Sequence, residues 1–211
     1  MSDVLRIGLV GLGAWGSNIL RALHAMSGVE IAWTAGRNWR VKLDRSARSP
    51  IDGLVIAIPA PAQVGIALTA LDAGVPVFLE KPMALTVADA TTIRDRAIRM
   101  GDLPVMVDHV HLFTPEYEAL RAELTGKTIE TLETFGGNCG PFRDWGAHTV
   151  LWDYGPHEAA FVLDLIGVPD TVEAACTSSA QHGTDWVVHL KWAGGPDATL
   201  TFGNTFAQKT R

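Results

Sequence analysis

Three glycines with the spacing G-x-G-x-x-G lie in the segment LVGLGAWGSNILRAL, residues 9–23, between an apolar run and a helical pattern. Where a strand turns directly into a helix, such glycines allow a tight turn, close approach of the backbone to a pyrophosphate, and close helix–strand packing. The helix N-terminus adds backbone N–H donors that favour an anion. The same spacing also occurs in turns that bind nothing, so the rest of the chain must support the interpretation. We expect a dinucleotide to contact Gly11, Gly13, Ala14, Trp15 and Gly16.

The first half of the chain alternates short apolar runs with helical patterns, which is typical of a parallel sheet covered by helices. The expected strands are Leu5–Val10, Glu30–Ala35, Gly53–Ile58, Val75–Leu79 and Pro104–Val107. The expected helices are Gly13–Met26, Pro61–Ala73 and Thr86–Met100. One crossover, residues 36–52, is too polar and too short for the usual strand plus helix, which predicts a reduced sheet.

The second half has a different pattern. Helices are expected at Pro115–Leu124, after the N-cap Thr114, and at His157–Ile166. Apolar and polar residues then alternate in residues 185–192 and 198–202, which predicts antiparallel strands with one buried face.

The predicted fold class is therefore α/β, with a Rossmann-type parallel sheet followed by a smaller α+β domain that contains an open, mainly antiparallel sheet. We expect residues 1–108 to form a dinucleotide-binding domain. Residues 109–211 are expected to form a domain for substrate binding and oligomerisation.

Composition excludes several classes of protein. The formal net charge of −6 argues against a general nucleic-acid binder, which needs a basic face. No apolar stretch approaches the ~18 residues of a membrane span, and the first residues carry no cationic leader. Cys139 and Cys176 have no metal-ligand spacing, so we expect buried, reduced thiols and a cytoplasmic location.

The choice of dinucleotide depends on the segment after the second expected strand. NAD-binding folds place an acid about 20 residues beyond the glycine motif, on the 2′-hydroxyl of the ribose. Here the segment reads Ala35-Gly36-Arg37-Asn38, with no acid. Arg37 could pair with a 2′-phosphate, so NADP is the predicted cofactor and NAD the second choice. A solvated basic loop is the alternative interpretation.

A second candidate group ends the fourth expected strand, in the segment FLEKPM. Ligands of open parallel sheets bind at the carboxyl ends of the strands, so Glu80 and Lys81 are expected to point toward the cofactor. A lysine beside a nicotinamide can polarise a carbonyl or hydrogen-bond to a reacting hydroxyl. The alternative is a surface lysine near a turn.

A third candidate group is the pair Asp153 and His157, which flanks a Gly-Pro sequence. We expect a turn there, with His157 opening the following helix, where a helix N-terminus disfavours imidazolium. A capping or core histidine is the alternative. The cluster Asp108, His109 and His111, with His148 further on, shows no complete ligand set, so no metal is predicted.

These segments together resemble the glucose–fructose oxidoreductase / inositol dehydrogenase / MocA (Gfo/Idh/MocA) family. The matching stretches are GLVGLGAWG, AIPAPAQ, EKP, HLFTPEYEALR and LWDYGPHEAAFVLDLIG. The resemblance implies a Rossmann domain followed by an open antiparallel sheet that often mediates homo-oligomers. It also implies hydride transfer between NAD(P) and a hydroxyl-bearing carbon of a sugar, cyclitol or nucleotide-sugar.

The resemblance also assigns site residues. Lys81 matches the family's catalytic lysine, and His157 and Asp153 match its D-x-x-x-H motif. Cofactor contacts are implied for Pro59 and for Gln63, which stands where the family commonly has histidine.

Substrate contacts are implied for three residues by GNCGPFRDW and LWDYGPH, which look most like the sugar-nucleotide branch. They are Asn138, Arg143 and Trp152. Members of the family are usually longer, so either the second sheet is small or the sequence is a truncated form. A non-catalytic dinucleotide-binding protein of the same fold is the alternative function.

Overall fold

The computed structural model describes residues 4–141, 149–180 and 183–210. The chain divides into two compact units, Met1–Asp108 and His109–Arg211, and each is described by itself.

The first unit is built on a five-stranded parallel sheet in the order β2-β1-β3-β4-β5. Its strands are β1 Leu5–Val10, β2 Val29–Ala35, β3 Gly53–Ile56, β4 Val77–Glu80 and β5 Val105–Asp108. The Rossmann-type parallel sheet predicted from the apolar runs is confirmed. Because these strands are covered on their faces, they carry continuous apolar runs rather than alternation.

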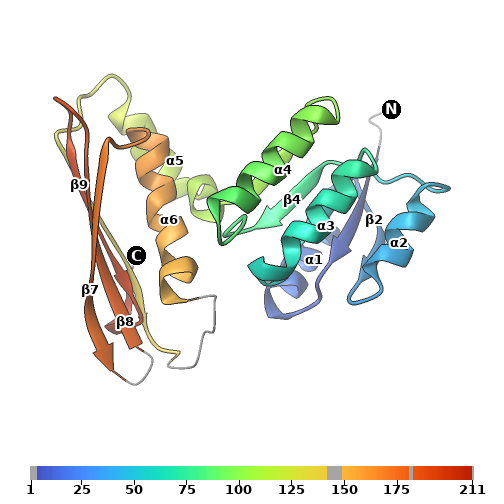
Figure 1. Cartoon of the computed structure of the whole chain (residues 1–211), viewed down its shortest axis with the longest axis horizontal. Helices are drawn as coiled ribbons and strands as arrows, with labels where there is room; N and C mark the ends of the chain where they lie inside the picture. The colour runs from blue at the N-terminus through green and yellow to red at the C-terminus, as the bar shows by residue number, and fades with distance from the viewer. Residues whose placement is uncertain (1–3, 142–148, 181–182, 211) are drawn as a thin grey trace. The chain divides into compact units, whose positions relative to one another are not determined.

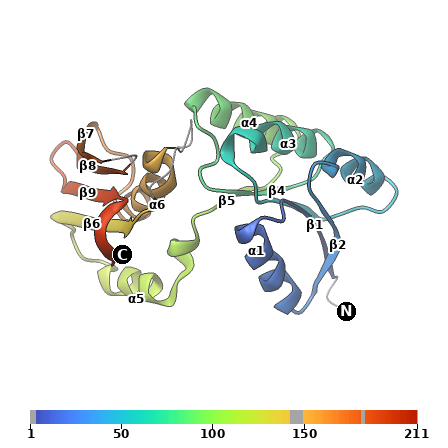
Figure 2. The same ribbon diagram turned by 90° about the horizontal axis from the view of Figure 1, so that it is seen from below.

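Four helices connect these strands. They are α1 Ala14–Ala25, α2 Trp39–Ser46, α3 Ala60–Asp72 and α4 Val87–Arg99. Figure 2 shows α1 on one side of the sheet and α2, α3 and α4 on the other. The order in which the strands are added to the sheet therefore reverses between β1 and β3. Open parallel sheets bind their ligands at such a reversal, at the carboxyl ends of the strands.

The apolar core of this unit lies between the sheet and α3 and α4. Its most buried large side chains include Leu54, Ile56, Leu71, Leu79 and Ile93. Thr86 caps α4 by accepting a hydrogen bond from the backbone N–H of Asp89 at 3.1 Å. The core fixes the strand ends that carry the candidate site.

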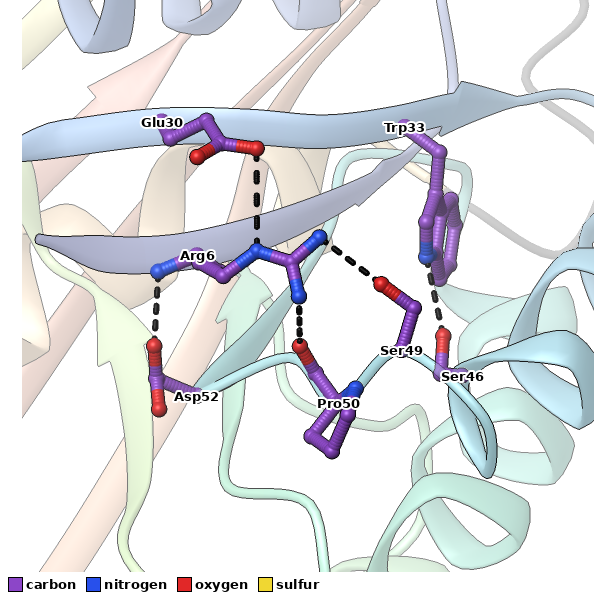
Figure 3. Close-up of polar contacts among 7 residues, drawn as sticks. All are labelled: Arg6, Glu30, Trp33, Ser46, Ser49, Pro50 and Asp52. Atoms are coloured by element: carbon purple, nitrogen blue, oxygen red, sulfur yellow. Dashed lines mark hydrogen bonds and ion pairs between the residues drawn. The ribbon is translucent and has the colours of Figure 1, made fainter.

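The crossover at residues 36–52 contains no strand, as predicted, but it does contain the short helix α2, which was not predicted. Leu43 on α2 is buried in the core, so tertiary packing stabilises a sequence that is otherwise polar. The Trp33 indole of β2 donates a hydrogen bond to the Ser46 hydroxyl at 3.0 Å (Figure 3).

Arg6 on β1 holds the end of the same crossover (Figure 3). Its guanidinium donates to the Pro50 carbonyl at 2.8 Å and to the Ser49 hydroxyl at 2.9 Å. The backbone N–H of Arg6 donates to the Asp52 carboxylate at 2.7 Å. The Arg6 guanidinium also forms an ion pair with the Glu30 carboxylate at 3.6 Å. These contacts bring the chain directly from α2 into β3 without an intervening strand.

The second unit contains a five-stranded sheet in the order β10-β6-β9-β8-β7. Its strands are β6 Thr131–Cys139, β7 Thr171–Ala180, β8 Gly183–Lys191, β9 Asp197–Gly203 and β10 Thr205–Thr210. Strands β7, β8 and β9 are labelled in Figure 1. Only the β6–β9 pair is parallel among the described pairs, so the sheet is mixed and mainly antiparallel, as predicted.

Three helical segments accompany this sheet: the short 3₁₀ helix η1 Val110–Phe113, α5 Pro115–Leu124 and α6 Val150–Leu165. The α5 prediction, with Thr114 as N-cap, is confirmed. The predicted start of the last helix is wrong, because α6 begins at Val150 and contains Pro156 in its interior.

The prediction of buried thiols is also wrong. Cys139 and Cys176 are both exposed, on strands at or next to the edges of the second sheet. Across the described residues, no helix is long and apolar enough to cross a membrane.

Candidate functional site

The glycine loop joins β1 to α1 at the point where the strand order reverses. Gly11 has a φ of +101°, and a Cβ there would lie 2.2 Å from the Ala57 carbonyl oxygen. A Cβ on Gly16 would lie 2.2 Å from the Gly11 carbonyl oxygen. These two glycines are therefore required for close packing of the loop, strand and helix.

Gly13 differs from its two neighbours, because a Cβ there would meet no atom within 4 Å. It is exposed and occupies the N-cap position of α1. Packing within this unit does not explain a glycine there, whereas a ligand lying against the loop does. The first N–H groups of α1 have no partner within the helix and can donate to an anion. The loop therefore fits a dinucleotide pyrophosphate.

Arg37 lies just beyond the carboxyl end of β2 and is exposed. The strand end is joined to the glycine loop, since the Gly11 N–H donates to the Ala35 carbonyl at 2.9 Å. Arg37 therefore follows by two residues Ala35, which is hydrogen-bonded to the glycine loop.

The EKP segment follows directly from the end of β4, and its Lys81–Pro82 peptide bond is cis. Gln63 of α3 is completely buried and supports this turn. Its side-chain amide donates to the Glu80 carbonyl at 2.9 Å and to the Pro82 carbonyl at 2.5 Å. Pro59, the N-cap of α3, is exposed at the end of the β3–α3 connection.

Glu80 is buried at 9% exposure and lies beside Asp108 on the neighbouring strand. The Trp15 indole, next to the glycine loop, donates a hydrogen bond to the Glu80 carboxylate. Burial, together with the hydrogen bond and negative charge of Asp108, raises the pKa of Glu80 to about 8. The Trp15 hydrogen bond and the charge of Lys81 act in the opposite direction.

Helix α6 presents two different faces to its surroundings. One face packs on the sheet of the second unit and contains Val150, Tyr154, Glu158 and Val162, spaced by four residues. A Cβ on Gly136 of β6 would lie 2.1 Å from a Glu158 carboxylate oxygen, so the helix approaches the sheet closely there.

The other face of α6 carries Asp153, His157 and Phe161 at the same spacing. The ring of His111 on η1 lies edge-on to the ring of His157, with centroids 4.6 Å apart and an interplanar angle of 73°. The ring of Tyr117 on α5 is tilted by 40° to the ring of Phe161, with centroids 5.0 Å apart. The histidines are thus placed by three helical segments of one unit.

Tyr117 also fixes the far end of this face. Its hydroxyl donates to the Asp164 carboxylate at 2.8 Å, and Arg121 lies 3.4 Å from the same carboxylate. Burial and the hydrogen bond to Asp164 raise the pKa of the Tyr117 hydroxyl.

His157 does not open a helix, contrary to the sequence-based expectation. It lies at the middle of α6, two turns from the start of the helix, whereas Asp153 lies in the first turn. Pro156 lacks an N–H and leaves the Trp152 carbonyl without its usual intrahelical donor, but it does not end the helix. Gly155 permits the close approach of the Phe202 ring, 3.1 Å from where its Cβ would lie. The helix-dipole argument for a neutral His157 therefore does not apply.

The three expected substrate contacts have different outcomes. Asn138 of β6 donates its side-chain amide to the Tyr154 hydroxyl at 3.0 Å, which ties the sheet to α6. Trp152 is half-buried in the first turn of α6. Arg143 and His148 lie outside the described residues.

The structure brings together, within the first unit, the glycine loop, Trp15, Glu80 and the Gln63-supported turn that carries Lys81. Within the second unit it places Asp153 and His157 on one helix face beside His111. Two residues of these groups, Asp108 and His111, were not predicted as site residues. Asp108 follows an apolar strand and could have been found from strand order, whereas the contact of His111 with His157 has no local sequence signal. The described residues contain no group of three or more potential metal ligands.

The parallel sheet with its glycine loop defines a Rossmann-type fold with a candidate dinucleotide-binding loop. A family described as an oxidoreductase family with an NAD-binding Rossmann fold, Gfo/Idh/MocA, matches residues 37–109. With the similarity to relatives below, this match shows that the chain belongs to the Gfo/Idh/MocA family.

Similarity to known proteins extends over both units. An inositol 2-dehydrogenase of Acidothermus cellulolyticus is 32% identical over 142 residues, which are 59% of this chain and 42% of the relative. A 4-carboxy-2-hydroxymuconate-6-semialdehyde dehydrogenase of Sphingobium sp. is 27% identical over 93% of this chain and 71% of its own.

The crystal structure of a protein from Magnetospirillum magnetotacticum MS-1, described as an oxidoreductase, has a TM-score of 0.86 and 30% identity to this chain. The similarity covers 98% of this chain and 72% of that chain. The chain thus covers 42% of the length of the inositol 2-dehydrogenase and 72% of the length of the solved structure.

Proposed function

We propose that the protein is an NAD(P)-dependent oxidoreductase that acts on a hydroxyl-bearing carbon of a sugar, cyclitol or nucleotide-sugar. The observation that carries the proposal is Gly13, an exposed N-cap glycine whose missing side chain serves no packing purpose within its unit. The open loop and the family membership both support dinucleotide binding. The names of the two relatives support dehydrogenation of a small molecule.

The bound nicotinamide would supply or accept a hydride at the substrate carbon. The chain's own task is then to bind the substrate and to move the hydroxyl proton. Lys81 would hydrogen-bond to the reacting oxygen, and His157 would exchange its proton. Asp153, one helical turn earlier, would orient the imidazole of His157. Proton and hydride transfer must be closely timed, because a free alkoxide is too high in energy in a dry site.

The remaining assignments follow the resemblance. We propose Asn138, Arg143 and Trp152 as substrate contacts, with Pro59, Gln63 and Glu80 at the dinucleotide. Gln63 would act by holding the turn that carries Lys81, since its amide is already engaged with that turn. A cytoplasmic location is part of the same proposal.

NADP is the proposed cofactor because Arg37 follows β2 where an acid would select NAD. Arg37→Ala should weaken NADPH about tenfold and leave NADH unchanged, since a charged hydrogen bond to the 2′-phosphate is lost. Calorimetric titration with both dinucleotides measures this difference. Arg99→Ala, at the exposed end of α4, removes the same charge and should change neither affinity. An unchanged NADPH preference in Arg37→Ala contradicts the assignment.

The proposed activity is tested by measuring NAD(P)H formation or consumption with a panel of cyclitols, sugars and nucleotide-sugars. Turnover of a member of the panel supports the enzyme. The trimmed crossover at residues 36–52 favours the second candidate, a non-catalytic dinucleotide-binding protein of the same fold. Dinucleotide binding with no turnover across the panel would support that candidate.

We propose a homo-oligomer formed through the second sheet. The face opposite α6 carries a cross-strand row of Phe135, Thr201 and Val187, and Phe135 is 50% exposed. Phe135→Lys should shift the protein toward monomer in sedimentation velocity, because a charge would be buried in the interface. Leu120→Lys, on an exposed position of α5, is the matched control. Equal sedimentation of Phe135→Lys and wild type, or a monomeric wild type, contradicts the proposal.

A further inference from the structure

Two carboxyl groups meet at the ends of adjacent strands in the first unit. Glu80 and Asp108 are the last residues of β4 and β5 and are directly paired in the parallel register. Leu79 and Val105 belong to or pack on the α3–α4 core, so both carboxyl groups lie on the opposite face of the sheet, where α1 lies (Figure 2). Asp108 lies close enough to Glu80 to raise the pKa of the Glu80 carboxyl both through side-chain hydrogen bonding and through its charge.

A hydrogen bond between two carboxyl groups requires a proton, because two carboxylates only accept. Two ionised carboxylates that lie side by side on adjacent strands repel each other. One of the pair therefore keeps its proton to a pH well above the usual titration range of a carboxylic acid. The burial of Glu80 adds to the cost of a second charge.

The pair is joined to the glycine loop through Trp15. Trp15 is the second residue of α1, and its indole N–H donates to a Glu80 carboxylate oxygen. Trp15 is 48% exposed, so it is not held in place by burial. The groups that act on the Glu80 carboxyl are Asp108 from β5, Trp15 from α1 and the adjacent Lys81. Lys81 is the only cation among them.

We propose that Glu80 and Asp108 share one proton and act as a positioning pair for the dinucleotide, holding Trp15 beside the glycine loop and setting the local charge. The choice of ligand rests on the proposed function, whereas the shared proton does not. With the proton bound, the pair carries one negative charge; without it, the pair carries two. A dinucleotide pyrophosphate is itself anionic, so the protonated pair is the form that favours its binding.

The direction of the pH effect follows from the raised pKa of Glu80. As the pH rises through about 8, the pair gains a negative charge. Affinity for NADH should therefore fall by about fivefold, the effect of one partly screened charge within the site. By linkage, NADH binding at pH 8 should take up a fraction of a proton, because the ligand favours the protonated pair.

The experiment is a calorimetric titration of the protein with NADH from about pH 6.5 to about pH 9.5, in two buffers of different ionisation enthalpy. NADH is the better probe because, unlike NADPH, it has no 2′-phosphate to titrate. Wild type should lose affinity around pH 8 and take up protons there. Constant affinity across the range, with no proton uptake, overturns the proposal.

Asp108→Asn is the informative variant. It removes the negative charge that keeps the proton on Glu80 and replaces the carboxylate by a neutral amide, whose oxygen is a weaker acceptor, so the fall in affinity should move to lower pH and proton uptake at pH 8 should vanish. Asp102→Asn, in the exposed turn at the opposite end of β5, removes the same charge and should keep the wild-type profile. Identical profiles for Asp108→Asn and wild type contradict the pair.

A ligand-free measurement separates this proposal from the dinucleotide site. The side-chain carboxyl carbon of Glu80, followed by NMR in wild-type protein, should titrate near pH 8. Titration at the ordinary pH of a glutamate overturns the shared proton, whatever the protein binds. If neither NADH nor NADPH binds at any pH while Glu80 titrates near 8, the proposed function and the ligand of the pair both fail, and only the shared proton stands.

Discussion

Lys81→Met is expected to lower kcat about 10²- to 10⁴-fold, the range of a positioned proton-transfer group. Lys81 directly follows β4, in a turn held by the Gln63 amide. Methionine keeps the length and apolar part of the side chain but cannot donate to the reacting oxygen. Steady-state kinetics with the best substrate of the panel measures the loss, and dinucleotide titration should show affinity within about twofold of wild type.

The control for this prediction is Lys127→Met. Lys127 is exposed and pairs with Glu123 on the surface of the second unit, so its replacement should change kcat little. Full turnover by Lys81→Met would contradict the proton chemistry proposed for this residue.

Gly13→Val and Gly16→Val are expected to have opposite effects, although the chemical change is the same. At Gly13 an added Cβ would meet no protein atom within 4 Å, so the melting temperature should fall much less than in Gly16→Val, by no more than the small cost of a valine at an N-cap. The side chain would instead project into the space proposed for the pyrophosphate. Dinucleotide affinity should fall about 10- to 100-fold, because hydrogen bonds to a charged group are worth about 1.5–3 kcal/mol each.

Gly16→Val supplies the comparison. Its Cβ would lie 2.2 Å from the Gly11 carbonyl oxygen, and relief requires backbone movement at a cost of at least about 1–3 kcal/mol. The melting temperature of this variant should fall by several degrees, as measured by calorimetry or circular dichroism. Wild-type dinucleotide affinity in Gly13→Val would show that the loop is only a turn.

The first unit could be predicted largely from sequence, because its strands are short apolar runs and its helices have clear ends. The alternation of β1, α1 and β2 around the glycines follows directly from residues 5–35. The helix α2 could not be predicted in the same way, since its only deeply buried apolar side chain is Leu43. Contacts from distant residues, including the Trp33–Ser46 hydrogen bond, stabilise this region.

The second unit shows where local patterns fail. Gly155-Pro156 indicated a turn, but both residues lie within α6, where the face that packs on the sheet outweighs the local preference. Strand β6 contains Gly136 and Gly137, which weaken the strand signal. They are needed because Glu158 and the Phe206 ring occupy the space that their side chains would fill.

The candidate site was predicted as residues but not as contacts. The glycines, Lys81, Asp153 and His157 are visible in the sequence because each has a motif around it. The pairing of Glu80 with Asp108 depends on strand register, and the contact of His111 with His157 depends on how η1 packs on α6. Neither relation has a signal in the neighbouring residues.

The decisive measurement is a calorimetric titration of the wild-type protein with NADPH and NADH at neutral pH. We expect binding of one dinucleotide per chain with a dissociation constant of about 1–100 μM, and tighter binding of NADPH. Absence of binding by both dinucleotides to folded protein would contradict a dinucleotide site at the Gly11–Gly16 loop, and with it the proposed oxidoreductase.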